Sequence, residues 1–145
     1  YKLKLLMMSS GMSKDETANY LGVSRPIFDA SLAGHGDPEE AEEFVDGLNE
    51  LVSHLRSVAD NVHDHIEEIA EERGDPEGIE LAVPTDDAEV REMGYPTKSC
   101  FDAVVRMLME ADFEALNPVF VPRGSTAGSG MALDLTADPE PERKP

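Results

Sequence analysis

The clearest pattern in the chain is a stripe of apolar positions between residues 41 and 69. These positions recur at alternating spacings of three and four, which is the repeat of one face of an α-helix. The stripe is made of Ala41, Phe44, Leu48, Leu51, Leu55, Val58, Val62, His65 and Ile69. Asp37-Pro-Glu-Glu40 supplies a cap, a first-turn proline and acids at the positive end of the helix dipole. The pattern predicts one helix of about 35 residues, roughly 50 Å long, ending near Gly74, or a break near Gly47.

Two interpretations of this stripe remain open from the sequence. The stripe can be the core face of a bundle formed with a second predicted helix, Lys98 to Ala111, which is capped by Thr97 and apolar along one face. It can equally be a coiled-coil seam between chains. In that second interpretation the oligomer interface consists of Phe44, Leu48, Leu51, Leu55, Val58, Val62 and Ile69.

Two shorter helices are predicted before the stripe. Residues 13–16, Ser-Lys-Asp-Glu, have the form of a capping box, in which the Ser and Glu side chains each bind the other's backbone N–H. The helix that follows should end at Tyr20 or Leu21, because Gly22 can adopt a left-handed conformation. Ser24 then has the position of a second cap, for a helix with proline in its first turn that runs to about Ala33.

The stretch Glu16-Thr-Ala-Asn-Tyr-Leu-Gly-Val-Ser-Arg-Pro-Ile-Phe-Asp-Ala-Ser-Leu32 resembles the helix-turn-helix motif of phage repressors, Cro-type proteins and excisionase-like regulators. The resemblance covers residues 13–33. It implies that the second helix enters the major groove of DNA. The side chains that would hold the two helices at a fixed angle belong to the motif core Ala18, Leu21, Gly22, Val23, Phe28 and Leu32.

The same resemblance places the DNA contacts. The residues that would face DNA are Ser13, Lys14, Ser24, Arg25, Ile27, Asp29 and Ser31. Arg25, at the start of the second helix, is the main candidate for a base edge or a phosphate, while Lys14 and Ser13 could reach the phosphate backbone. The alternative for Arg25 is a surface ion pair with Asp29, four residues further along the helix.

The chain departs from this family after Gly36. Excisionase-like domains continue there into a basic wing, whereas this chain continues into an acidic helix. A single unit would neutralise few phosphates and bind DNA weakly, so the resemblance implies a homo-oligomer that multiplies the contacts. The order of helix-turn-helix, helical region and short β-containing tail is also similar to that of the small terminase subunits of tailed phages.

Charge is distributed unevenly along the chain. The formal net charge is −19. Residues 1–36 carry four basic and three acidic residues, and the remaining residues carry eight basic and 28 acidic ones. Double-stranded DNA is therefore expected to meet only the first quarter, since acidic surfaces repel nucleic acid. The alternative function is an acidic helical protein-interaction module, an adaptor or DNA mimic, that binds a protein partner and makes no DNA contact.

The C-terminal half mixes short strands with helices. A strand is predicted at Ile79–Val83, a short acidic helix at Asp86–Met93, an edge strand at Val119–Val121 and a further short strand at Met131–Leu135. The expected fold class is mainly α, with an N-terminal helix-turn-helix, a long central helix, and a C-terminal helix with a few short β-strands.

Three regions are predicted along the chain. Residues 1–36 form the helix-turn-helix unit, although residues 1–12 fit a strand or a helix equally. Residues 37–122 form an acidic helical region for oligomerisation or partner binding. Residues 123–145 form a flexible linker and tail that contains the possible strand at 131–135.

No pattern of catalytic, metal-binding or cofactor-binding residues is found, and an enzyme is not expected. His54, His63 and His65 do not share one helix face, and the single cysteine, Cys100, is expected to be a structural thiol. No apolar run approaches the roughly 20 residues that span a membrane, and Tyr1–Met8 is too short for a signal peptide, so a cytoplasmic location is expected.

Overall fold

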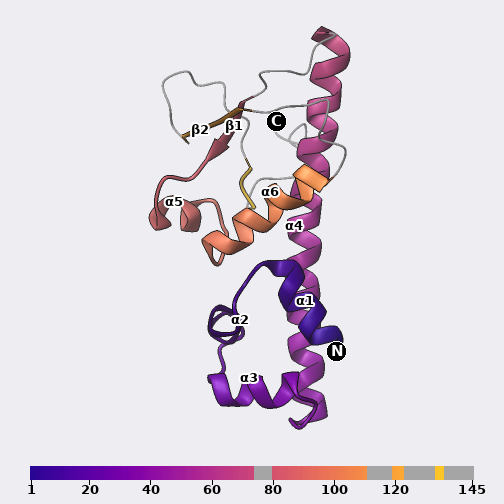
Figure 1. The fold of residues 1–145 in the computed structure, drawn as a ribbon, viewed down its shortest axis with the longest axis vertical. Helices are drawn as coiled ribbons and strands as arrows, with labels where there is room; N and C mark the ends of the chain where they lie inside the picture. The colour runs from indigo at the N-terminus through magenta and orange to yellow at the C-terminus, as the bar shows by residue number, and fades with distance from the viewer. Residues whose placement is uncertain (74–79, 111–118, 123–132, 136–145) are drawn as a thin grey trace, which may run out of the picture.

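The structure is a computed structural model that describes residues 1–73, 80–110, 119–122 and 133–135. Within these residues the fold is mainly helical, with six helices and two short strands. Figure 1 shows α4 (Pro38–Arg73) as the long axis of the molecule, with α1, α2 and α3 at one end and the two strands toward the other. The predicted mainly α fold class is confirmed at this level.

Helix α4 is continuous over 36 residues, so the predicted break near Gly47 is not present. The side chain of Leu21 approaches this glycine, and a Cβ built on it would lie 3.5 Å from Leu21 Cδ2. Gly47 therefore accommodates a neighbouring side chain rather than a kink. The predicted start is confirmed, because the Glu39 N–H donates to Asp37 Oδ1 at 3.0 Å.

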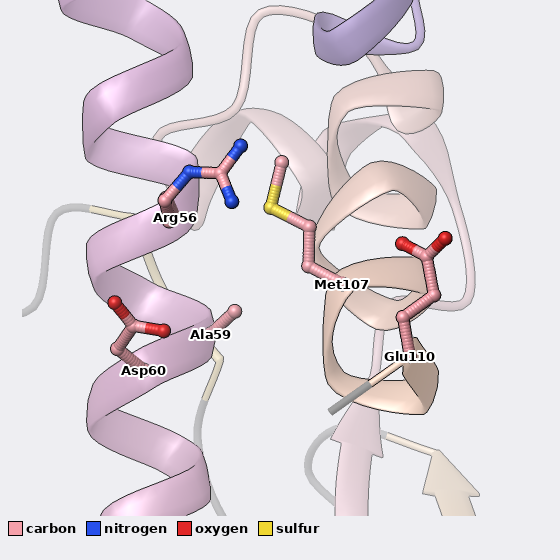
Figure 2. A pocket seen from close by; sticks show the side chains of 5 residues that line it. All are labelled: Arg56, Ala59, Asp60, Met107 and Glu110. Carbon is pink, nitrogen blue, oxygen red and sulfur yellow. The ribbon is translucent and has the colours of Figure 1, made fainter. Parts of the chain in front are cut away.

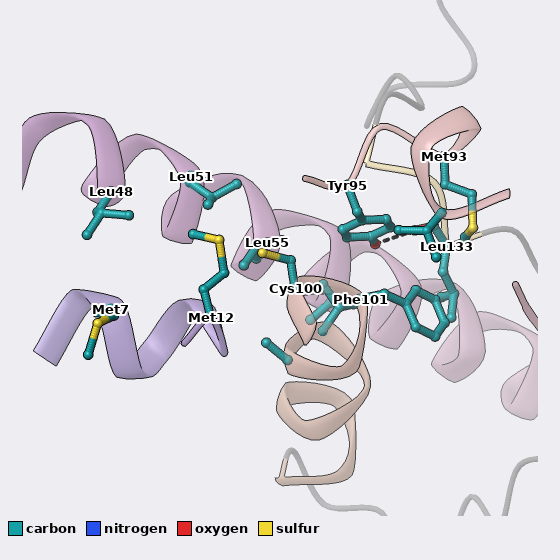
Figure 3. Packing of buried hydrophobic residues seen from close by; sticks show 14 of the residues in the cluster. Met7, Met12, Leu48, Leu51, Leu55, Met93, Tyr95, Cys100, Phe101 and Leu133 are labelled. Atoms are coloured by element: carbon teal, nitrogen blue, oxygen red, sulfur yellow. Dashed lines mark hydrogen bonds between the residues drawn. The ribbon is translucent and has the colours of Figure 1, made fainter. Parts of the chain in front are cut away.

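The opening residues form a helix and not a strand. Helix α1 (Lys2–Ser10) packs along the first half of α4, with Leu3 and Met7 buried one turn apart. It ends at Gly11, which has a φ of 81°. In Figure 3, Met7 lies beside Leu48 of α4.

The apolar stripe of α4 is the core face of the chain itself. Leu48 and Leu55 are fully buried, and Phe44, Leu51 and Val62 are buried as well. Val58 and Ile69 are partly buried and pack against the same cluster. Helices α1 and α6 (Lys98–Glu110) cover much of this face, so the intersubunit seam predicted as an alternative is not a free surface. These buried contacts account for the three-and-four spacing except at His65, which is exposed; the neighbouring Ile66 is fully buried in its place.

The C-terminal elements follow the predicted order. Strand β1 (Glu80–Val83) leads through α5 (Asp87–Glu92) and α6 to β2 (Val119–Pro122), and the two strands pair in parallel. Asp86 caps α5 through the N–H of Glu89, 2.8 Å from its Oδ1. The ring of Tyr95 meets Phe101 of α6 edge-on at a centroid distance of 5.6 Å, which joins the α5–α6 connection to the core (Figure 3).

Residues 133–135 do not form the predicted strand. Leu133 is fully buried, and its carbonyl accepts a hydrogen bond from the Tyr95 hydroxyl. The Leu135 N–H donates to the Met93 carbonyl at 2.8 Å. These backbone groups bind the α5–α6 connection, which is why they form no strand ladder. Residues 131 and 132, the linker at 123–130 and the tail at 137–145 lie outside the described residues.

Candidate functional site

The first helix of the candidate site is built as its capping box predicts. In α2 (Lys14–Leu21), the Glu16 N–H donates to Ser13 Oγ at 3.2 Å, and the Ser13 N–H donates to Glu16 Oε1 at 2.9 Å. The hydroxyl of Thr17 also donates to the Ser13 carbonyl at 2.7 Å. These bonds satisfy donors at the helix start that would otherwise lack partners.

A tight turn then redirects the chain. Gly22 has a φ of 75°, the left-handed conformation expected of it, and the Val23 N–H donates to the Ala18 carbonyl at 3.0 Å. Helix α3 (Arg25–Leu32) begins after Ser24, which occupies the predicted N-cap position but makes no side-chain capping bond. We call residues 13–33, two helices joined by this turn, the α2–α3 corner.

The inner side of the α2–α3 corner is fixed by the predicted motif core. Ala18 and Phe28 are buried, while Leu21, Val23 and Leu32 are partly buried against the core cluster. The Phe28 and Phe44 ring centroids lie 6.2 Å apart, which ties α3 to α4. Because the inner side is held in this way, α3 presents a fixed opposite side to solvent.

Arg25 is held between two carboxylates. Its Nε lies 3.0 Å from Asp29 Oδ1, the pairing predicted as the alternative to DNA contact. Its Nη1 lies 2.6 Å from Asp15 Oδ1 on α2. Hydrogen bonding to Asp15 and then Asp29 raises the pKa of Arg25. The guanidinium remains 41% exposed, so it lies at the surface but is not free of partners.

The pairing of Asp15 with Arg25 is not evident from the sequence. Ten residues separate the two, and only the turn at Gly22 brings the start of α2 beside the start of α3. Predicting this ion pair would have required the relative positions of α2 and α3 in space.

The remaining predicted DNA contacts divide into two groups. Ser13, Lys14 and Ser24 are exposed, and Ile27 is 43% exposed although it is apolar. Ser31 is only 8% exposed, and its Oγ lies close to Gly36 with no hydrogen-bond partner within the described residues. The prediction for Ser31 is corrected accordingly, since a side chain facing inward does not meet DNA.

The surroundings of the α2–α3 corner are acidic on the side of α4. Tyr20 of α2 is 41% exposed, and partial burial followed by the nearby Glu50 carboxylate raises the pKa of its phenol. Lys14 and Arg25 are the two cations of the corner itself. Any anion that approaches from the α4 side therefore meets negative charge first.

A hollow of about 240 Å³ lies between α4 and α6, away from the corner. Figure 2 shows the Arg56 side chain, Asp60 and Ala59 on α4 and the side chains of Met107 and Glu110 on α6 around it. The lining combines one cation with two carboxylates and a thioether.

Cys100 is buried in α6 and lies against Thr97, whose Oγ1 is 3.5 Å from the sulfur. Burial raises the pKa of the thiol above its ordinary value, which keeps it protonated and a poor nucleophile. Across the described residues, no three His, Cys, Asp or Glu side chains are grouped so that they could hold a metal ion. Of the helices described, none is both long and apolar enough to cross a bilayer.

Comparison of the chain with protein-family models, with curated proteins and with solved structures gives no match.

Proposed function

We propose that the chain is a sequence-recognising DNA-binding protein that contacts DNA through the α2–α3 corner and acts as an oligomer. The supporting observation is the orientation of α3. Phe28 anchors α3 in the core, while Ser24 at the N-cap and Ile27 in the first turn remain exposed. A short helix anchored in this way is the form that enters a major groove. A transcriptional regulator or a phage-type DNA-binding subunit would use it.

The proposed contacts follow from the exposed residues. Ser24 and Ile27 would meet base edges and thymine methyl groups, while Ser13 and Lys14 at the start of α2 would meet phosphates. Arg25 would exchange Asp15 or Asp29 for DNA. In the free protein these carboxylates hold the guanidinium at the surface of the corner, 2.6 Å and 3.0 Å from its nitrogens.

The small number of cations sets the expected strength of binding. Each corner offers two cations, Lys14 and Arg25, for phosphate contact. If each neutralises about one phosphate, the logarithm of the affinity falls with the logarithm of salt concentration with a slope of about −2 per chain. With so shallow a slope, the affinity for DNA falls little as the salt concentration rises. Binding would therefore persist at salt concentrations that dissociate more basic proteins from DNA.

The test adds one negative charge to the proposed contact surface. Ser24→Glu places a carboxylate at the start of α3, where Ser24 makes no side-chain hydrogen bond. Ser57→Glu makes the same change at an exposed position of α4 and serves as the matched control. In gel-shift assays over genomic fragments, we expect Ser24→Glu to lose at least about tenfold in affinity, or about 1.4 kcal/mol.

The outcomes separate the proposal from its alternative. Ser57→Glu should bind like the wild type within about twofold. Equal DNA binding by both variants would show that the α2–α3 corner does not contact DNA. If the wild type binds no DNA at every salt concentration tested, the proposal is overturned.

A second candidate function has its own observation. The solvent side of α4 carries a dense set of exposed carboxylates, made of Glu39, Glu42, Glu43, Asp46, Glu50, Asp60, Asp64, Glu67, Glu68, Glu71 and Glu72. A surface of this charge suits an acidic interaction module that binds a basic protein. Binding of a polylysine peptide that is lost in Glu67→Gln/Glu71→Gln and kept in Ser24→Glu would favour this function.

A further inference from the structure

The side of α3 opposite its buried Phe28 is apolar. With about 100° between successive residues, Pro26, Ala30 and Ala33 lie within about 60° of one another on that side, and Ile27 lies about 60° further round the helix. Ile27 is 43% exposed, Pro26 and Ala33 are exposed, and Ala30 is partly exposed. We call these four residues the outward face of α3. Figure 1 shows α3 at one end of the molecule, beside the start of α4 and remote from the two strands.

The polar side chains of α3 lie outside its outward face. Arg25 and Asp29 pair with each other at one flank, where Asp15 of α2 also holds Arg25. Ser31 is only 8% exposed. The hydroxyl of Ser24 at the N-cap can donate or accept a hydrogen bond, so it can contact any base and discriminates little between them. The outward face itself therefore offers only aliphatic contacts.

Arg25 is better suited to a phosphate than to a base edge. Bidentate contact with guanine uses two adjacent N–H donors of the guanidinium. Nε donates to Asp29 and Nη1 donates to Asp15, so each edge of the guanidinium already has one donor engaged. Exchanging a carboxylate for a phosphate replaces one ion pair with another, whereas exchanging it for neutral guanine loses the ion pair. Base discrimination is therefore left to the outward face.

We infer that the α2–α3 corner recognises the C5 methyl groups of thymines, through Ile27 and Ala30 of the outward face. The inference rests on the proposed DNA contact and names the feature of DNA that the corner reads. In the major groove thymine presents a methyl group, which makes apolar contacts with side chains such as that of alanine. Ile27 and Ala30 are three residues apart, so their Cβ atoms lie about 5–6 Å apart, within reach of methyl groups on neighbouring bases.

Two properties distinguish methyl recognition from phosphate contact. Each methyl group that α3 covers contributes about threefold to fourfold in affinity, through the apolar surface removed from water. Salt screens the contacts of Lys14 and Arg25 with phosphates but does not weaken an apolar contact in this way. The preference for methylated over unmethylated bases should therefore persist at salt concentrations that lower the overall affinity.

The experiment compares short duplexes of alternating d(AT) with the same duplexes of alternating d(AU), in gel-shift assays on the full chain. Uracil keeps the hydrogen-bonding groups of thymine and lacks only the methyl group. We expect the wild type to bind d(AT) at least about threefold more tightly than d(AU) at every salt concentration. Ile27→Ala should lose at least about threefold in affinity for d(AT) and less than about twofold for d(AU). Leu5→Ala, which removes an exposed aliphatic side chain from α1, is the matched control and should keep the wild-type preference.

Methyl recognition and DNA contact fail in different ways. Equal binding of d(AT) and d(AU) by the wild type, or an equal loss on both duplexes in Ile27→Ala, would overturn methyl recognition. Binding of the wild type to genomic fragments but not to d(AT) would overturn it as well. In each of these cases, a loss of about tenfold in Ser24→Glu would still support DNA contact through the α2–α3 corner. A wild type that binds no duplex and no genomic fragment would overturn the proposed function, and methyl recognition with it.

Discussion

Glu16 of α2 and Ser99 of α6 are joined by a hydrogen bond across 83 residues of sequence, with Ser99 Oγ donating to Glu16 Oε1 at 3.0 Å. The same carboxylate oxygen accepts the Ser13 N–H that closes the capping box. One side chain therefore completes the start of α2 and attaches the α2–α3 corner to α6. The orientation of the corner depends on this shared acceptor.

Removing that acceptor should destabilise the chain measurably. Glu16→Ala deletes both hydrogen bonds, so we expect the free energy of unfolding in urea to fall by about 1–2 kcal/mol. Ser99→Ala removes the hydrogen bonds of Ser99 Oγ to Glu16 and to Thr97 Oγ1 but leaves the capping box closed, and it should cost about 0.5–1.5 kcal/mol. Glu43→Ala, at an exposed position of α4, is the control and should change stability by less than about 0.5 kcal/mol. A Glu16→Ala loss no larger than this control would contradict the shared role.

Two glycines with the same backbone conformation should respond differently to alanine. Gly11 and Gly34 both have a φ of 81°. A Cβ on Gly11 would lie 2.5 Å from the Ser99 carbonyl oxygen, whereas a Cβ on Gly34 meets nothing within 4 Å. We expect Gly34→Ala to cost about 1–2 kcal/mol through the left-handed conformation. Gly11→Ala should cost about 1–3 kcal/mol more through overpacking, as thermal or urea unfolding would measure. Equal losses would mean that α6 does not lie against Gly11.

The assignment of the α4 stripe to the core can be tested at Leu48, which is fully buried. Leu48→Ala should lower the free energy of unfolding by about 2–5 kcal/mol. Because the contacts lie within one chain, the loss should not depend on protein concentration. A loss that shrinks as the protein is diluted would show that Leu48 lies in an interface between chains.

Releasing Arg25 should strengthen DNA binding. Asp15→Asn removes the carboxylate 2.6 Å from Nη1 and one negative charge from the α2–α3 corner. We expect affinity in the gel-shift assay to rise about threefold to tenfold, which corresponds to about 0.7–1.4 kcal/mol. Asp46→Asn makes the same change on exposed α4 and should alter affinity by less than about twofold. Weaker binding by Asp15→Asn would show that the ion pair positions Arg25 for DNA rather than withholding it.

Alkaline pH should destabilise the fold partly through Tyr95. Burial, followed by the charge of Asp134, raises the pKa of this phenol above its ordinary value of 10.0. The stabilisation is complete below pH 10.0. It is lost as pH rises above that value toward the folded-state pKa, because the unfolded chain releases the proton first. Above about pH 10.5, Tyr95→Phe should reduce the slope of stability against pH by about 1.4 kcal/mol per pH unit.

The control for this prediction is Tyr1→Phe, since Tyr1 is 88% exposed. Urea unfolding between about pH 9 and 11.5 should give wild-type and Tyr1→Phe profiles with the same slope. At neutral pH, Tyr95→Phe should also cost about 1 kcal/mol through the lost hydrogen bond to the Leu133 carbonyl. Parallel profiles for all three proteins would contradict the role of Tyr95.

Much of the fold could be predicted from local signals in the sequence. The capping box at Ser13, the left-handed Gly22 and the cap at Asp37 each act through neighbouring backbone groups, so the sequence alone predicts them well. The boundaries of α2, α3, α4 and α5 follow from such signals. Strand and helix could not be separated for residues 1–12, because a short apolar run fits both periods.

The sequence could not predict which element packs against each helix surface. The stripe of α4 is equally suited to another helix of the same chain or to a second chain, and only the packing of α1 and α6 decides between them. Asp15 and Arg25 meet across a turn, and Ser99 meets Glu16 from the far half of the chain. Ser31 was misplaced because helical periodicity does not reveal that the loop at Gly36 covers it.

The parallel pairing of β1 with β2 has a consequence for the order of folding. Glu80 pairs with Val119, so the two strands can meet only after the intervening chain, α5 and α6 included, has returned to the same edge. Closing so long a loop loses much chain entropy before any strand contact compensates for it. We therefore expect the strand pair to assemble after the helices around α4, which form the scaffold on which it closes.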